Sequence, residues 1–101
     1  MLKATDYIPV GHENGITRSE LRDLTGFSDR EIREQIRLES LNGELIINLQ
    51  DGKGYFKPGD DVESVRAWMR ITMSRMEEEE KKLLKARRYL LDEQGKALSR
   101  R

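Results

Sequence analysis

Two successive helix-start signals limit what the first half of this chain can fold into. Thr17 and Glu20 have the T-x-x-E spacing of a capping box, and Ser28 and Glu31 have the S-x-x-E spacing of a second one. Between them, Gly26 supplies the backbone freedom that a sharp corner requires. The segment therefore predicts a short helix, a tight turn and a longer helix, which is the order of a helix-turn-helix.

The apolar positions agree with this pair of helices. Leu21 and Leu24 share one face of the first helix, and Ile32 and Ile36 repeat at i, i+4 in the second. Asn42-Gly43 is expected to close the second helix.

The hydrophobic period changes after the second helix. Residues 44–49 are β-branched and apolar, residues 50–54 form a glycine-rich turn cluster, and residues 55–57 are a second short strand before Pro58-Gly59. This pattern predicts a β-hairpin, and a helix-turn-helix followed by a hairpin is a winged helix. In the alternative interpretation the hairpin only covers the core.

The N-terminal segment, Leu2 to Val10, predicts a short helix that stops near Pro9 and covers one side of the core. The only histidine, His12, follows in a turn-rich loop. Because no second histidine and no cysteine accompanies it, we expect His12 to be exposed or to cap a helix. Neither a metal nor a cofactor is predicted.

A long helix is predicted over residues 60–94, since no proline or glycine interrupts the chain before Gly95. Roughly 35 helical residues extend ~50 Å at 1.5 Å per residue, longer than a domain this small can cover. Apolar residues recur every seven positions, at Val62, Met69, Met76, Leu83 and Leu90, although Glu79 lies in the alternating set. The pattern favours a coiled coil or a helix hairpin.

This apolar stripe needs a partner. Residues 62–69 are expected to pack on the core, but beyond Met76 no chain remains to cover the stripe. We therefore expect a homodimer, with parallel and antiparallel pairing both open. The residues predicted to form the dimer contact are Val65, Trp68, Met69, Thr72, Met76 and Leu83.

The formal net charge is zero, which weakens a simple nucleic-acid interpretation, since proteins that bind nucleic acids usually carry excess positive charge. The distribution is uneven, because residues 60–80 are net acidic and residues 81–101 are net basic. Residues 95–101 are expected to form a disordered basic tail. The basic stretch from residue 81 is either a solvated face or a second nucleic-acid contact, and we favour the solvated face.

Residues 16–58 resemble the winged-helix domains of bacterial transcription regulators, including the biotin-repressor-like type. The shared residues are I-T-x-x-E-L-x-x-L-T-G-x-S-x-R-x-I-R-x-x-I over 16–36, then Asn42-Gly43-x-x-Ile46 and Gly54-Tyr55. Residues 6–16, D-Y-I-P-x-G-x-E-N-G-I, and the long charged helix rich in arginine are similar to those of small phage or prophage helix-turn-helix proteins, a resemblance that covers residues 1–94. The expected fold is mainly α with a small β-hairpin, with a winged helix-turn-helix over 1–59 and a long C-terminal helix over 60–94.

One position departs from that pattern. Such domains usually have a leucine three residues after the position of Ile36, and here Glu39 stands there. Either Leu38 or Leu41 takes over the packing, or Glu39 lies at a partly wet edge, because a buried unpaired carboxylate is costly.

The resemblance implies that the second helix enters the major groove of DNA. Arginine pairs bidentately with guanine, and a serine at a helix start binds phosphate. The predicted DNA contacts are Ser28, Arg30, Arg33, Glu34 and Arg37 on the second helix, Thr17, Arg18 and Arg22 on or beside the first, and Lys53 and Lys57 in the hairpin. In the alternative interpretation, the three arginines of the second helix only solvate it through pairs with Asp29 and Glu34.

The function predicted from the sequence is double-stranded DNA binding by a dimer, as a phage-type transcription regulator or replication accessory. The alternative is a protein-interaction module that uses the long helix. An enzyme is not expected, because the chain lacks cysteine, a glycine-rich phosphate loop and a serine/histidine pair. With no signal peptide and no apolar run of ~20 residues, we expect a cytoplasmic protein that does not bind membranes.

Overall fold

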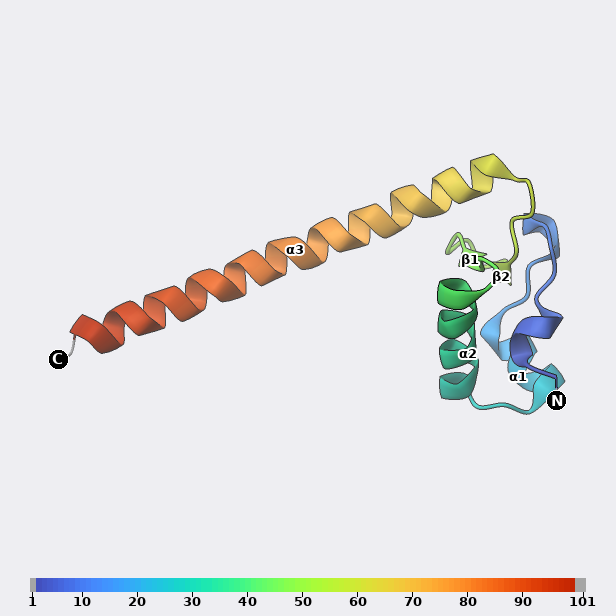
Figure 1. Cartoon of the computed structure of the whole chain (residues 1–101), viewed down its shortest axis with the longest axis horizontal. Coiled ribbons are helices and arrows are strands. Elements are labelled where there is room, and N and C mark those ends of the chain that lie inside the picture. The colour runs from blue at the N-terminus through green and yellow to red at the C-terminus, as the bar shows by residue number, and fades with distance from the viewer. Residues whose placement is uncertain (1, 100–101) are drawn as a thin grey trace. The chain divides into compact units, whose positions relative to one another are not determined.

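The computed structural model describes the backbone of residues 2–99 and the side chains of residues 2–96 (Figure 1). The chain is mainly helical with one small hairpin and a long C-terminal helix, as predicted. It divides into two compact units, a first unit of Met1–Met69 and a second unit of Arg70–Arg101. In order, the elements are the 3-10 helices η1 (Ala4–Tyr7) and η2 (His12–Asn14), α1 (Arg18–Thr25), α2 (Asp29–Asn42), β1 (Ile47–Asn48), β2 (Tyr55–Phe56) and α3 (Val62–Ser99).

Both predicted capping boxes are present. The Thr17 hydroxyl accepts a hydrogen bond from the Glu20 amide at 3.1 Å, and the Glu20 carboxylate accepts from the Thr17 amide at 3.1 Å. Ser28 and Glu31 form the same reciprocal pair at the start of α2. Gly26 adopts φ 76° and ends α1, so the tight turn forms where the sequence placed it.

The end of α2 resolves the question about Glu39. The helix stops at Asn42, where the amide of Gly43 donates to the Glu39 carbonyl at 2.7 Å. The Glu39 carboxylate is half-buried and accepts from the Glu44 amide at 3.0 Å. Leu38 and Leu41 remain exposed. The expectation of a partly wet edge is therefore confirmed, and the replacement of the packing by a neighbouring leucine is wrong.

One hydrophobic core holds the first unit together. It consists of Ala4, Ile8, Leu21, Ile32, Ile36 and Ile46, with Ile16, Phe27 and Tyr55 packed against it. The amide of Ala4 donates to the Gln35 side chain at 2.7 Å, which fastens η1 to α2. The short N-terminal helix thus forms before Pro9 as expected, in 3-10 geometry. Leu24, expected beside Leu21 on the inner face, is exposed.

The hairpin is shorter than the sequence suggests. Only Ile47 and Asn48 pair with Phe56 and Tyr55, in antiparallel register, whereas residues 44–49 and 55–57 were expected to be strands. Ile46, before the paired residues, is buried in the core instead.

The hairpin is also joined to the segment before α1. Ile16 and Tyr55 exchange backbone hydrogen bonds of 2.9 and 2.7 Å, which adds a bridge beside β2. Gly54 makes this approach possible, because it is buried at φ 90° and a Cβ there would overlap the Ile16 carbonyl.

Helix α3 begins just after Asp61, whose carboxylate accepts from the amide and hydroxyl of Ser64 at 3.1 and 2.6 Å. These hydrogen bonds hold the pKa of Asp61 below its usual value. The first turns belong to the first unit, with Ser64 buried and Val65 and Trp68 half-buried. Val62 and Met69 are exposed, so the packing expected of residues 62–69 on the core is only partial.

The predicted end of this helix is wrong. Helix α3 continues through Gly95 to Ser99, so residues 95–99 do not form a disordered tail, and residues 100–101 lie outside the described residues. One glycine costs only about 1 kcal/mol in a helix, which good helix formers on both sides offset. Among residues 2–99 no helix combines the length and the apolar character needed to cross a membrane.

Candidate nucleic-acid interface

Three arginines share one exposed side of α2. Arg30, Arg33 and Arg37 are three and four positions apart, so they project from the same helix face. The side chains of Arg33 and Arg37 are 60% and 57% exposed. Ile32 and Ile36 on the other side are buried in the core, and this anchors the helix with its arginine face toward solvent.

Two of these arginines are paired with carboxylates on their own helix. Arg37 donates to both carboxylate oxygens of Glu34, at 2.7 and 3.1 Å, which lowers the pKa of Glu34 and raises that of Arg37. Arg33 Nε lies 3.2 Å from Asp29. The solvating pairs of the alternative interpretation are therefore present for Arg33 and Arg37. Arg30 forms no ion pair or side-chain hydrogen bond with any described residue.

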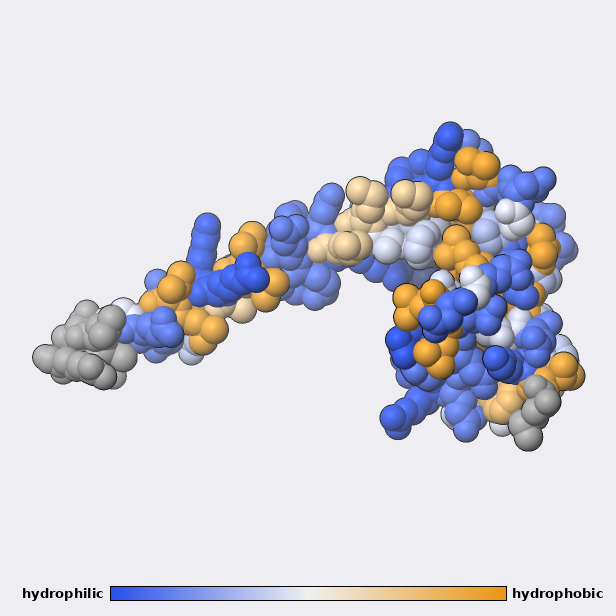
Figure 2. All heavy atoms as spheres, viewed as in Figure 1, coloured by the Kyte–Doolittle hydropathy of each residue, from blue (hydrophilic) through white to orange (hydrophobic). Residues whose placement is uncertain are grey.

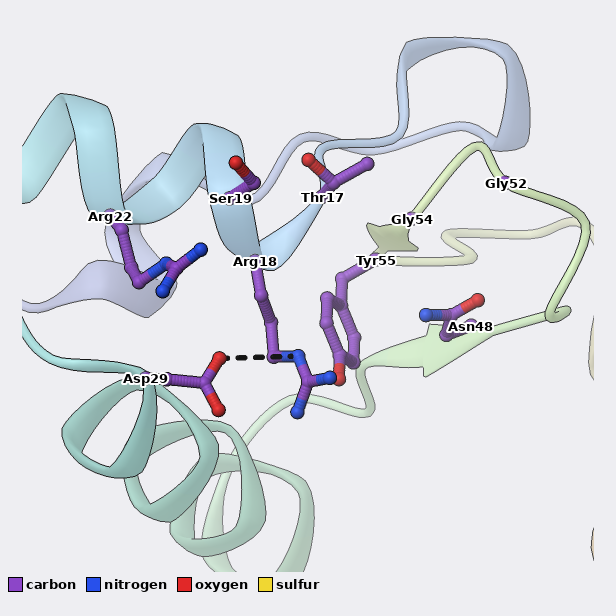
Figure 3. Close-up of a pocket in the computed structure, with 9 residues that line it drawn as sticks. All are labelled: Thr17, Arg18, Ser19, Arg22, Asp29, Asn48, Gly52, Gly54 and Tyr55. Carbon is purple, nitrogen blue, oxygen red and sulfur yellow. Dashed lines mark ion pairs between the residues drawn. The ribbon is translucent and has the colours of Figure 1, made fainter.

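Asp29 connects the starts of the two helices. Its Oδ1 lies 3.5 Å from Arg18 Nε, and its Oδ2 forms the ion pair with Arg33 Nε. Figure 3 shows the Arg18 side chain extending from α1 beside the Tyr55 ring toward Asp29. One carboxylate thus positions two guanidinium groups that the sequence predicted as DNA contacts.

A polar groove of about 340 Å³ lies between the start of α1, the start of α2 and the hairpin (Figure 3). It brings together three of the predicted contacts, Thr17, Arg18 and Arg22. It also includes polar groups that the sequence did not single out, Ser19, Asn48 and Tyr55. Asn48 and Tyr55 enter the groove only because of the hairpin register, for which the sequence carried no signal.

The two helix-capping residues are only partly available to a ligand. The backbone amides of Thr17 and Ser28 already donate to Glu20 and Glu31. Their hydroxyl oxygens accept from the helix amides, while each hydroxyl hydrogen remains able to donate. At either position the hydroxyl group is therefore the side-chain donor that could bind a phosphate oxygen.

The two hairpin lysines differ in their surroundings. Lys53, near the tip, is exposed, and its side chain pairs with no described residue. Lys57 is only 18% exposed, and its Nζ lies 3.6 Å from Glu44. The structure therefore disfavours Lys57 as a surface contact and leaves Lys53 accessible.

The hairpin tip is fastened to the loop before α1 by His12. Its side chain is 28% exposed and pairs with Asp51, and its ring lies 5.1 Å from that of Phe56. The hydrogen bond from His12 lowers the pKa of Asp51. In the described part of the chain, no group of three or more His, Asp or Glu side chains is arranged to hold a metal ion.

The charge of the first unit opposes phosphate binding at long range. Residues 1–69 contain thirteen Asp and Glu against nine Lys and Arg, and the second unit has the opposite excess. The first unit can therefore attract phosphate only where its lysines and arginines gather locally, as on the outer side of α2 and in the groove beside it.

The residues predicted for dimerisation lie on both sides of the boundary between the units. Val65, Trp68 and Thr72 are half-buried, whereas Met69, Met76 and Leu83 are exposed. Exposed apolar side chains that the dimer prediction did not include continue the stripe, namely Met73, Leu84, Tyr89, Leu90 and Leu91. Figure 2 shows apolar side chains interspersed with charged ones along α3.

Comparison with known proteins yields no relative: no family model matches the sequence, no curated protein matches it, and no solved structure matches the fold. The function is therefore inferred from the geometry of the chain itself.

Proposed function

We propose that this protein binds double-stranded DNA as a winged helix-turn-helix protein, with α2 in the major groove. The observation that carries the proposal is the arginine side of α2, where the side chains of Arg30, Arg33 and Arg37 are all exposed. A helix of this length fits the major groove, and its arginines reach the edges of guanine. The tight α1–α2 turn and the hairpin that follows support the same arrangement.

The accessible cations and hydroxyl groups have distinct roles in this proposal. Arg30, which forms no ion pair or hydrogen bond with a carboxylate of the described residues, reads a base edge. Arg33 is oriented by Asp29, and Arg18 and Arg22 in the neighbouring groove bind backbone phosphates. The hydroxyl groups of Thr17 and Ser28 donate to phosphate, and Lys53 at the hairpin tip contacts the adjacent backbone.

A single copy binds weakly under this proposal, because the carboxylates of the first unit repel phosphate. Two copies joined through α3 double the number of phosphate contacts and raise the affinity without any new contact in each copy. We therefore propose a homodimer that uses the apolar stripe of α3. Its biological role would be that of a phage- or prophage-derived transcription regulator or replication accessory.

A second candidate function is a protein-interaction module in which the first unit is only a scaffold. Two observations favour it, the excess of carboxylates in the first unit and the exposed apolar side chains along α3.

The deciding experiment is fluorescence anisotropy of the full chain with random-sequence duplex DNA at several salt concentrations. The DNA hypothesis expects affinity to fall steeply with salt, and Arg30→Ala/Arg33→Ala/Arg37→Ala to abolish binding. A control variant, Arg66→Ala/Arg70→Ala/Lys96→Ala, removes the same charge from α3 and should retain most of the affinity. Equal losses in the two variants would contradict binding by α2. Wild-type affinity in the α2 variant would favour the second candidate.

A further inference from the structure

The charges of α3 are sorted into two adjacent blocks. The acidic block is Glu77–Glu80, and the basic block that follows consists of Lys81, Lys82, Lys85, Arg87 and Arg88. No carboxylate occurs after Glu80 until Asp92. Each block is exposed along its whole length.

Pairing within the helix satisfies these charges only weakly. Glu78 and Lys81 lie 3.5 Å apart, and Glu79 and Lys82 lie 3.0 Å apart, but all four side chains are at least 68% exposed. Exposed i, i+3 pairs of this kind contribute little to stability and exchange readily with other partners. The blocks are therefore available to a second molecule.

Apolar side chains just before the acidic block and within the basic block are also exposed. Met73, Met76 and Leu83 line a shallow groove of about 540 Å³ whose rim is formed by Arg75, Glu77, Glu79 and Glu80. A partner for this groove must bring apolar groups to its floor and positive charge to its rim.

We propose that the partner is a second copy of α3 that packs antiparallel, with the two helices crossing the pair's two-fold axis near Lys81. This inference rests on the homodimer of the proposed function and specifies its orientation. A helix with adjacent blocks of opposite sign is its own complement when it is reversed, because the two-fold axis places each acidic block against a basic one. Parallel pairing would instead place acid on acid and base on base.

The heptad pattern fixes the register around that centre. Residues equally distant from Lys81 face each other, so Met76 packs against Ala86 of the second copy and Leu90 against Thr72 of the second copy. Leu83 meets Glu79 of the second copy, whose aliphatic stem covers it while the carboxylate reaches solvent and the basic block. A shift by one heptad in either direction would face the acidic block with itself or the basic block with itself.

Cysteine cross-linking tests the orientation, because the natural chain has no cysteine. The variants are Met76→Cys and Ala86→Cys, both at exposed positions on α3. In the antiparallel pair, like positions are ten residues apart along the axis, or about 15 Å, which no disulfide can span. We therefore expect a covalent dimer with one copy of each variant in the oxidised mixture, and none from either variant alone.

Two other outcomes would overturn the proposal. Covalent dimers from each variant alone would indicate parallel pairing. Absence of cross-linking together with a monomeric mass by sedimentation would refute self-association through α3. Salt gives an independent readout, because the dissociation constant of the antiparallel dimer should rise with NaCl, whereas a parallel dimer would tighten.

DNA binding by the cross-linked dimer separates this inference from the proposed function. A cross-linked heterodisulfide that shows no salt-dependent affinity for duplex DNA would leave the antiparallel pair standing and refute DNA binding. If the protein instead is monomeric and binds DNA, and the α2 arginine variant loses that affinity, DNA binding would stand and the antiparallel pair would be refuted.

Discussion

His12 Nε2 lies 2.5 Å from Asp51 Oδ2 and joins the loop before α1 to the tip of the hairpin. The two residues are 39 positions apart in the chain. Asp51 also accepts a hydrogen bond from the Lys53 amide, so this one carboxylate binds both the hairpin turn and the loop that carries His12. This pairing limits the movement of the tip that carries Lys53.

The pairing of His12 with Asp51 should make the stability of the protein depend on pH in the acidic range. The hydrogen bond from His12, aided by the Lys53 amide, keeps the pKa of Asp51 below its ordinary value of 3.8. A lowered carboxylate pKa adds stability that is complete above the ordinary value and is lost as the pH falls through the lowered one. Asp51→Asn should therefore reduce Tm slightly at neutral pH and lose less stability below pH 3.8 than the wild type, in thermal melts followed by circular dichroism. Glu13→Gln, in the same loop as His12, should behave like the wild type.

The second prediction compares two glycines of the hairpin turn. Both have positive φ, 88° at Gly52 and 90° at Gly54, but only at Gly54 would a Cβ overlap the backbone of the segment before α1. Gly52→Ala should cost about 1 kcal/mol from backbone conformation alone. Gly54→Ala should cost about 3 kcal/mol, because the Ile16–Tyr55 bridge must also separate. Urea unfolding of the two variants gives the difference, and equal costs would show that the bridge contributes nothing.

The third prediction follows from Asp29. Replacing it with asparagine removes a negative charge beside the proposed phosphate contacts and releases both Arg18 and Arg33. Asp29→Asn should therefore bind random-sequence DNA more tightly, and anisotropy titrations should show a several-fold gain at low salt. Discrimination between sites should decrease, because the two guanidinium groups lose their fixed positions. Asp23→Asn, on the exposed side of α1, is the matched control. An equal gain in affinity there would show that the change in net charge alone explains the effect.

The fourth prediction ranks the arginines of α2. Arg37 must leave its two hydrogen bonds with Glu34 before it can contact DNA, whereas Arg30 has no such partner. Arg30→Ala should therefore reduce specific affinity about tenfold or more, as expected for loss of a base contact worth about 1–3 kcal/mol. Arg37→Ala should reduce it less, and Glu34→Gln should increase it. A reversed order in competition binding assays would assign the base contact to Arg37.

Local sequence signals predicted the helices of the first unit well. The capping boxes at Thr17 and Ser28 depend on side chains within three residues of each other, so their geometry is contained in the sequence. The turn at Gly26 and the end of α2 at Gly43 are equally local.

Features that depend on distant contacts were not predictable in this way. Glu39 caps the amide of Glu44 only because the chain reverses at Gly43, and the pairing of His12 with Asp51 requires the finished hairpin. In the proposed interface, the arginine face of α2 was predictable from the sequence, because the three arginines have helical spacing. The link from Asp29 to Arg18 required the packing of α1 against α2, which no pattern in the sequence specified.

The uninterrupted length of α3 has a consequence for the DNA site itself. In the antiparallel pair, the end of the first unit at Met69 lies opposite residue 93 of the second copy. The two attachment points are then about 36 Å apart along the axis, at 1.5 Å per residue. The two-fold axis of this pair relates the arginine face of one copy to that of the other. The operator of the proposed DNA-binding dimer is therefore expected to be an inverted repeat.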